Sequence, residues 1–366
     1  MRYSVAAALA WCLLLLPGEA GALPRFAART GARCQSCHVN PAGGGMRQAF
    51  GVQYGREELP LPALSEEFSL EEFLTEITAS IFVGADMRTL YYHQQVPDTG
   101  AGGGPDRNAF WQMQGDIYLN FRLARKVSLY LDKGLYDGFE VFGLAQVLPA
   151  GGFLKVGKFV PAYGMRMDDH RIFTRDATGF SPEQRPELTG MEAGVSPGPV
   201  ALTAGIFNSR DGFGQGSTKA FLGRLEASLQ GGEDFFVGLG GSAFTRKQGS
   251  ERTTLYGGFG SVGYGPFTLL GEGTFIRSER DGAAVTGLAA FAEAGYAVHP
   301  GVEIKFLYDF LDRDLDLKSG SASRYGIGAE FFPISGVEVR PLYRIAAEDP
   351  VSVRNDEFNL MIHFYL

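Results

Sequence analysis

From about Phe73 to the last residue, apolar and polar side chains alternate along most of the chain. A period of two is typical of β-strands, whose successive side chains point to opposite faces of a sheet. The clearest examples lie at 221–230, 302–310 and 337–345, where the charged residues share one face. Leu222 is an exception to the first of these patterns. Such strands need one apolar and one aqueous side, so the pattern predicts a membrane-embedded antiparallel β-barrel.

The number and spacing of these strands also indicate a barrel. We expect about sixteen strands, an even number as in bacterial outer-membrane barrels. Short turns and longer polar loops alternate between them, which places the short turns in the periplasm and the long loops outside. The alternative, a soluble β-sandwich, is disfavoured by regular hairpins without a helical interlude. The predicted strands begin near Phe73, Asn108, Val127, Phe139, Phe153, Leu188, Val200, Lys219, Phe235, Thr253, Phe267, Ala284, Val302, Arg324, Val337 and Asp356.

The N-terminus has the features of an export signal. Arg2 precedes an apolar core at 5–16, and small residues at 20–22 provide a cleavage site. We therefore divide the chain into a signal peptide at 1–22, a small segment at 23–70 and the barrel at 71–366. The formal net charge of −8 argues against a nucleic-acid partner. These features predict a protein of the bacterial outer membrane, in contact with its lipid.

The small segment contains the motif Cys34-Gln35-Ser36-Cys37-His38. Cys-x-x-Cys-His is the attachment signature of c-type haem, in which two thiols bind the porphyrin and the histidine binds the iron. A zinc site would need further ligands, and no second Cys-x-x-Cys follows. A dithiol redox pair would be expected near a βαβ unit, which the pattern does not suggest. We predict one covalent haem c, attached at Cys34 and Cys37, with His38 as proximal ligand.

The second axial ligand of the iron is less well defined by the sequence. Met46 follows three glycines at 43–45, and a bend there would bring its sulfur to the other face of the haem. Met46 is therefore our candidate for the distal ligand. The alternative, which we favour, is that it packs against the edge of the haem with Phe50, because methionine often fills apolar gaps. His93, His170 and His363 are further candidates if the haem lies inside the barrel.

The connection at 164–187 is too long for a simple hairpin turn. A loop of this length can fold into the lumen of a barrel and narrow it. Asp168, Asp169 and His170 offer ligands for a divalent metal such as ferrous iron. Nearby arginines at 166, 171 and 175 would repel a cation, so we favour a charged constriction whose residues pair with one another.

Several parts of the N-terminal sequence together resemble a known family. The stretch PRFAARTG at 24–31, the motif from Cys34 to His38, Pro41 and Phe50 are similar to the fused monohaem cytochrome–porins of iron-oxidising bacteria. The resemblance implies a small cytochrome segment ahead of a porin-like barrel. It also implies an electron conduit in which extracellular ferrous iron gives electrons to the haem and periplasmic cytochromes or other carriers take them onward.

These observations lead to one main functional hypothesis and two alternatives. The main hypothesis is outer-membrane electron transfer through a haem held at or in the barrel, with iron oxidation as the enzymatic activity if there is one. Because the apolar band of such a barrel is about 25 Å tall, we expect the haem segment to plug the lumen rather than hang free in the periplasm. The alternatives are a diffusion porin for small solutes with an accessory haem segment, and a structural barrel that never receives haem.

Overall fold

A computed structural model describes the residues at 25–65, 75–96, 106–134, 138–167, 169, 171–181, 184, 186–209, 218–232, 234–353 and 355–366. The predicted signal peptide at 1–22 lies outside the described residues. Within the described part, no helix combines the length and the apolar character needed to cross a membrane.

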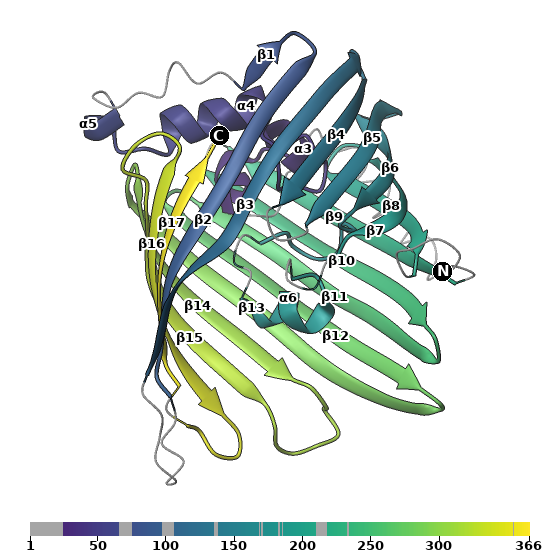
Figure 1. The fold of residues 1–366 in the computed structure, drawn as a ribbon, viewed down its shortest axis with the longest axis vertical. Helices are drawn as coiled ribbons and strands as arrows, with labels where there is room; N and C mark the ends of the chain where they lie inside the picture. The colour runs from purple at the N-terminus through teal and green to yellow at the C-terminus, as the bar shows by residue number, and fades with distance from the viewer. Residues whose placement is uncertain are drawn as a thin grey trace.

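The dominant element is a closed antiparallel barrel (Figure 1). Strand β17 pairs with β2, which closes the ring, while the short strand β1 (Glu76–Thr78) forms a hairpin with β2. The sixteen barrel strands are β2 (Ile81–Gln94), β3 (Arg107–Ala124), β4 (Val127–Gly134), β5 (Phe139–Leu148), β6 (Gly152–Phe159), β7 (Leu188–Val195), β8 (Val200–Asn208), β9 (Lys219–Gly231), β10 (Phe235–Gln248), β11 (Glu251–Tyr264), β12 (Phe267–Arg280), β13 (Ala283–His299), β14 (Val302–Asp312), β15 (Ala322–Phe331), β16 (Val337–Glu348) and β17 (Glu357–Tyr365).

The alternation of side chains has the predicted structural meaning. On β9, Phe221 and Leu225 face outward and are about half exposed, at 52% and 51%. On β14, by contrast, Glu303, Lys305 and Asp309 point inward and are buried. The outer surface is therefore apolar and suited to lipid, and the charged side chains are gathered in the interior.

The predicted strand positions agree closely with the observed ones from β3 onward. Each predicted start from Asn108 to Asp356 lies within two residues of an observed strand start. Phe73, where the first strand was predicted to begin, lies outside the described residues, and the first described strands are β1 from Glu76 and β2 from Ile81. Apolar residues continue before the β1–β2 turn, so the alternation alone did not reveal the hairpin.

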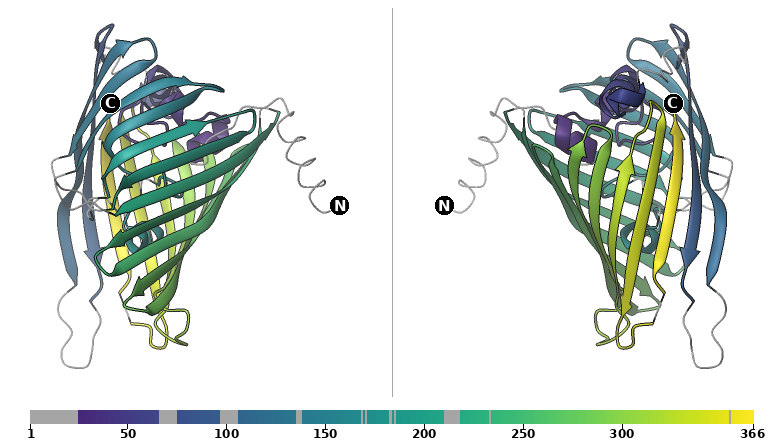
Figure 2. Two further views of the ribbon diagram at one scale, coloured as in Figure 1. Left: turned by 90° about the vertical axis from the view of Figure 1, so that its right-hand side faces the viewer. Right: turned by 90° about the vertical axis from the view of Figure 1, so that its left-hand side faces the viewer.

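The N-terminal segment, residues 25–65, lies at the mouth of the barrel that carries the short turns (Figures 1 and 2). Contacts with this rim fix its position: the Leu61 N–H donates to the Phe332 carbonyl at 2.9 Å, and the Ser335 hydroxyl donates to the Arg56 carbonyl at 2.8 Å. The C-terminus lies at the same end. The segment contains α2 (Arg25–Thr30), α3 (Cys34–Cys37), α4 (Ala49–Gln53), the π-helix η1 (Tyr54–Glu58) and α5 (Pro62–Ser65).

The long connection between β6 and β7 folds into the barrel, as predicted, and carries the short helix α6 (Phe173–Thr178) (Figure 1). Its backbone is held by carboxylates of the barrel wall. The Phe173 N–H donates to Asp309 at 2.9 Å, and the Met165 N–H donates to Glu272 at 2.8 Å. Because these acceptors are buried and charged, the loop is tied to the wall at several points.

The charges of this loop pair with the wall, which corrects the prediction that they pair with one another. Ion pairs join Arg166 to Glu140 at 3.4 Å, Arg171 to Glu357 at 2.9 Å and Arg175 to Glu272 at 4.0 Å; Asp169 binds Arg344. Asp168 and His170 lie outside the described residues. Within the described part, no group of three or more metal-ligating side chains is found.

Candidate functional site

Two arginines of α2 anchor the N-terminal segment in the barrel mouth. The Arg25 guanidinium is buried and lies 2.6 Å from Glu330 and 3.4 Å from Glu293. One helical turn further, Arg29 lies 2.7 Å from Glu303. The three glutamates belong to the barrel wall, on β13, β14 and β15. The segment is therefore inserted into the mouth, and its first helix contacts the wall through buried charge pairs.

These pairs are part of a larger buried network on the wall. Lys305 lies 2.8 Å from both Glu293 and Glu330, and Arg340 lies 3.0 Å from Glu330 and 2.7 Å from Glu338. A buried charge is tolerated when it is paired on all sides, and removing one partner leaves the other uncompensated. Arg25 is thus a structural partner of the wall rather than an exposed surface charge.

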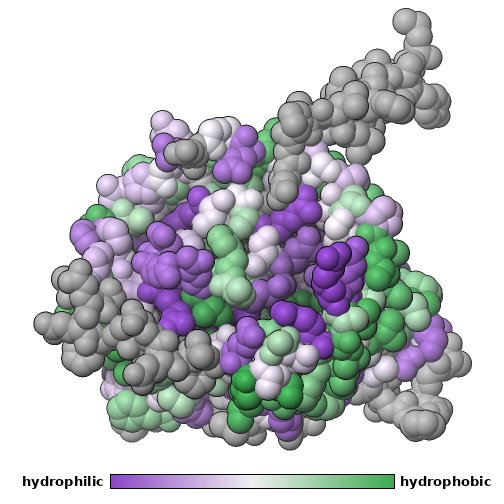
Figure 3. Space-filling view, turned by 90° about the horizontal axis from the view of Figure 1, so that it is seen from above, coloured by the Kyte–Doolittle hydropathy of each residue, from purple (hydrophilic) through white to green (hydrophobic). Residues whose placement is uncertain are grey.

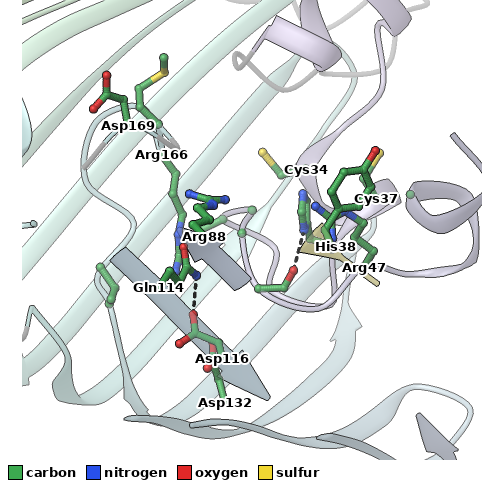
Figure 4. Close-up of a pocket in the computed structure, with 18 of the residues that line it drawn as sticks. Cys34, Cys37, His38, Arg47, Arg88, Gln114, Asp116, Asp132, Arg166 and Asp169 are labelled. Atoms are coloured by element: carbon green, nitrogen blue, oxygen red, sulfur yellow. Dashed lines mark hydrogen bonds between the residues drawn. The ribbon is translucent and has the colours of Figure 1, made fainter. Parts of the chain in front are cut away.

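The cysteine motif forms a single helical turn that neighbouring main chain holds in place. The His38 N–H donates to the Cys34 carbonyl and the Gln48 N–H donates to the Cys37 carbonyl, both at 2.8 Å. The Gln48 side chain also donates to the carbonyls of Gln35, at 2.9 Å, and His38, at 2.8 Å. Cys34, Cys37 and His38 all line one cavity (Figure 4). The structure therefore brings the three predicted haem residues together.

The environment of the motif keeps its groups uncharged. Burial lowers the pKa of His38 to about 3, and the nearby Arg47 adds to this effect. Burial also raises the pKa of Cys34 to about 12. The His38 Nδ1 lies 3.3 Å from the Gly45 carbonyl. Since a carbonyl only accepts hydrogen bonds, Nδ1 carries the proton, and Nε2 keeps the lone pair that a metal ligand needs.

The glycines at 43–45 are required by the turn that supplies this carbonyl. All three have positive φ angles, of 85°, 73° and 64°. A Cβ on Gly45 would lie 2.4 Å from the Tyr130 hydroxyl, and one on Gly44 would lie 2.6 Å from Arg166 Nε. Glycine is therefore needed at these positions for two reasons: the backbone is left-handed, and it closely approaches the wall and the connection between β6 and β7, called the inner loop below.

We expect Gly45→Ala to loosen the segment around the motif. Left-handed backbone costs a non-glycine residue about 1–2 kcal/mol, and the new methyl group would also displace Tyr130. Hydrogen exchange of amides at 34–50 should quicken roughly 5- to 30-fold. Gly232→Ala is the matched control, because Gly232 also has positive φ but has open space around its Cβ position. Unchanged exchange in Gly45→Ala would contradict this account of the turn.

Met46 is placed differently from the other predicted site residues. Its side chain is 2% exposed and belongs to a hydrophobic cluster with Val39, Tyr118 and Tyr130. Its N–H donates to the Tyr130 hydroxyl at 3.1 Å. Met46 thus packs in this cluster and is not among the residues that line the cavity, so its packing beside a haem and its role as distal ligand both stay predictions.

The other histidines differ in their distance from the motif. His363 lines the same cavity, but Nδ1 lies 2.8 Å from Glu338 and Nε2 lies 3.0 Å from Asp86, so both ring nitrogens are engaged. His93 pairs with Asp106 at 3.6 Å, near the long-loop end of β2. His170 lies outside the described residues.

The cavity occupies about 620 Å³ between the N-terminal segment, the inner loop and the wall. This volume is in the range of about 300–1,000 Å³ that small-molecule and cofactor sites have. Seen from the short-turn end, hydrophilic side chains surround the centre of the mouth (Figure 3). Arg88, Arg166, Gln114 and Asp116 lie across the cavity from the cysteine motif (Figure 4).

Comparison with known proteins assigns the barrel. The model of the family described as Gram-negative porin matches residues 66–339. The chain belongs to the Gram-negative porin family. It is thus an outer-membrane barrel, as its sequence predicted. The N-terminal segment precedes the matched range, and no curated protein matches the chain.

Solved porin structures share the fold of this porin at low sequence identity. An anion-selective porin from Comamonas acidovorans is 10% identical, with a TM-score of 0.58, and the match covers 78% of this chain and 99% of that one. OmpT of Vibrio cholerae is 13% identical, with a TM-score of 0.56 over 80% and 99%. OmpF of Salmonella typhi, in a complex with daunomycin, is 13% identical, with a TM-score of 0.55 over 78% and 97%.

Sequence reasoning missed the residues that complete the cavity of this porin. Arg47 follows Met46 directly, but nothing in the motif marked it as a cavity residue. Gln114 and Asp116 lie on β3, where the Gln114 side chain donates a hydrogen bond to the Asp116 carboxylate. Their inward positions follow from the strand alternation, which would have placed them in the lumen. The alternation could not indicate which lumen residues face the N-terminal segment.

Proposed function

We propose that this porin carries one covalent haem c on its N-terminal segment and transfers electrons at the outer membrane. The observation that supports this proposal is the position of Cys34, Cys37 and His38, which line one cavity inside the barrel mouth. The haem would supply one-electron redox chemistry at its iron. Two thiols on one turn suit attachment of a c-type haem, and an uncharged imidazole nitrogen suits its iron.

The chain's own residues have separate tasks in this proposal. Cys34 and Cys37 would hold the haem through thioether bonds, and His38 would supply a nitrogen to its iron. The Gly45 carbonyl orients the His38 ring, as second-shell acceptors do for metal-binding histidines. Arg25 keeps the segment in the mouth through its pairs with Glu330 and Glu293.

The direction of electron flow in the proposal follows from the resemblance to cytochrome–porins. Ferrous iron outside the cell would be the donor, and periplasmic cytochromes or other carriers would be the acceptors. The segment lies at the short-turn end, which the loop parity assigns to the periplasm. A periplasmic carrier would therefore meet the segment directly, whereas an extracellular donor would act through the lumen and past the inner loop.

The first experiment is a haem stain of the mature protein after denaturing electrophoresis, followed by stopped-flow mixing with ferrous iron. Thioether attachment survives denaturation, so we expect a stained band. We also expect the reduced absorbance band to form within seconds. Absence of stain would reject the haem proposal as a whole. A stained protein that ferrous iron does not reduce would reject the donor and leave the haem assignment intact.

Diffusion of small solutes is a second candidate function, favoured by the family match over residues 66–339. In that case the N-terminal segment would be an accessory and the lumen would conduct. Planar-bilayer recordings distinguish the two candidates. A diffusion porin predicts steady conductance in the intact protein that is independent of redox state, whereas the haem proposal predicts a lumen that the segment obstructs.

A further inference from the structure

Arg47 is fixed beside the haem-binding motif but has no assigned task. Its backbone forms an isolated antiparallel bridge with His38. Its guanidinium lies over the ring of Tyr365 on the last strand, 4.5 Å from the ring centroid. It also lines the cavity that Cys34, Cys37 and His38 share (Figure 4). Main chain and side chain are therefore both held before any ligand binds.

The hydrogen-bonding capacity of Arg47 is incompletely used. Its Nη1 is buried and has no hydrogen-bond partner among the described residues. The nearby carboxylates have other partners, since Asp86 binds Arg88 and His363, while Glu338 binds Arg340 and His363. A buried cationic donor without an acceptor is unfavourable, so the position calls for an anionic group.

Two other arginines of the cavity, Arg88 and Arg166, already have carboxylate partners. Arg88 lies 3.4 Å from Asp86, and Arg166 of the inner loop lies 3.4 Å from Glu140. Arg47 is thus the one of these three for which the structure records no ion pair among the described residues. An arginine in this situation suits a carboxylate, because its planar group donates two parallel hydrogen bonds.

We propose that Arg47 binds a propionate carboxylate of the haem that Cys34 and Cys37 attach. This inference rests on the proposed function and adds a recognition residue to it. The porphyrin carries its two carboxylates on the edge away from the thioether bonds, and Arg47 supplies a buried donor on the wall of the same cavity. Arg47 is a binding residue for the anionic part of the haem, distinct from the residues that bind its iron and its vinyl carbons.

The test is redox-difference infrared spectroscopy of the full-length protein, made with haem that is ¹³C-labelled only in its propionate carboxylates. The variants are Arg47→Gln, Arg47→Lys and the matched control Arg122→Gln. Arg122 also stacks on an aromatic ring, that of Phe82 at 4.4 Å, but it is not among the residues that line this cavity. Haem content is measured in each variant to show that attachment has occurred.

We expect the labelled carboxylate bands to shift in Arg47→Gln, to shift less in Arg47→Lys, and to stay unchanged in Arg122→Gln. Unchanged bands in both Arg47 variants would overturn the inference while leaving covalent haem in place. Only the porphyrin carries the label, so the bands would also stay unchanged if Arg47 bound a free anion instead. A wild-type protein without haem would reject the proposed function, and this inference with it.

Discussion

Reversing the charge of Arg25 should displace the N-terminal segment and open the barrel. In Arg25→Glu a third carboxylate would face Glu330 and Glu293, which now lie 2.6 and 3.4 Å from the arginine. All three side chains are buried, so water would screen their repulsion little. The single-channel conductance should rise several-fold above that of the wild type, towards that of a variant lacking residues 25–65.

The expected effect is large because the pair is buried. Leaving a buried charge uncompensated costs about 3–5 kcal/mol, which sets an upper limit of roughly 100- to 5,000-fold on the change in the docking equilibrium, because Lys305 still pairs with both glutamates. Reversal of the charge adds repulsion to this loss. Arg25→Gln, which only removes the charge, should therefore also raise the single-channel conductance, but by less.

The matched control is Arg277→Glu. Arg277 also pairs with a glutamate, Glu279 at 2.9 Å, but both side chains are well exposed at 48% and 39%. Exposed pairs contribute about 0–1 kcal/mol, so this variant should conduct like the wild type. Planar-bilayer recordings and limited proteolysis of the segment measure the outcome. Wild-type conductance in both Arg25→Glu and the variant lacking residues 25–65 would show that the segment does not obstruct the lumen.

The barrel could be predicted from the sequence because each strand records its own environment. A residue such as Phe221 faces lipid, and the next residue along the same strand faces the lumen. The alternation alone therefore locates the barrel wall. The pattern did not reveal the short hairpin of β1 with β2 that precedes the barrel wall, because no change of pattern marks it. The local pattern thus gives strands and turns, and it is weakest where the chain enters the barrel.

The contacts of the site depend on positions that are distant in sequence, so the sequence did not reveal them. Arg25 and Glu330 are separated by most of the chain, and only the closed barrel brings them together. The loop arginines were expected to pair locally, but inside a barrel the nearest acids belong to the wall. The motif residues Cys34, Cys37 and His38 could be singled out because they are adjacent in the sequence, and their binding of haem stays a prediction.

The second large effect is expected when the motif itself is changed. The double variant Cys34→Ser with Cys37→Ser should lose all covalently bound haem, because serine hydroxyls do not form the thioether bonds. The haem stain and the visible absorbance of the purified protein measure this loss. The shift in mobility on heating, which folded outer-membrane barrels show in electrophoresis, checks that the barrel is still formed.

Replacing His38 separates attachment of the haem from ligation of its iron. In His38→Gln both thiols remain, so some haem should stay bound, but its absorbance spectrum should change because the proximal nitrogen is gone. His93→Gln is the matched control, since His93 pairs with Asp106 and lies outside the lining of the cavity. If His93→Gln altered the spectrum as much as His38→Gln, or if the double cysteine variant kept its haem stain, the motif would not be the haem site. With the expected results, by contrast, attachment and ligation would both be assigned to one helical turn inside the barrel mouth, where the buried pairs of Arg25 hold it.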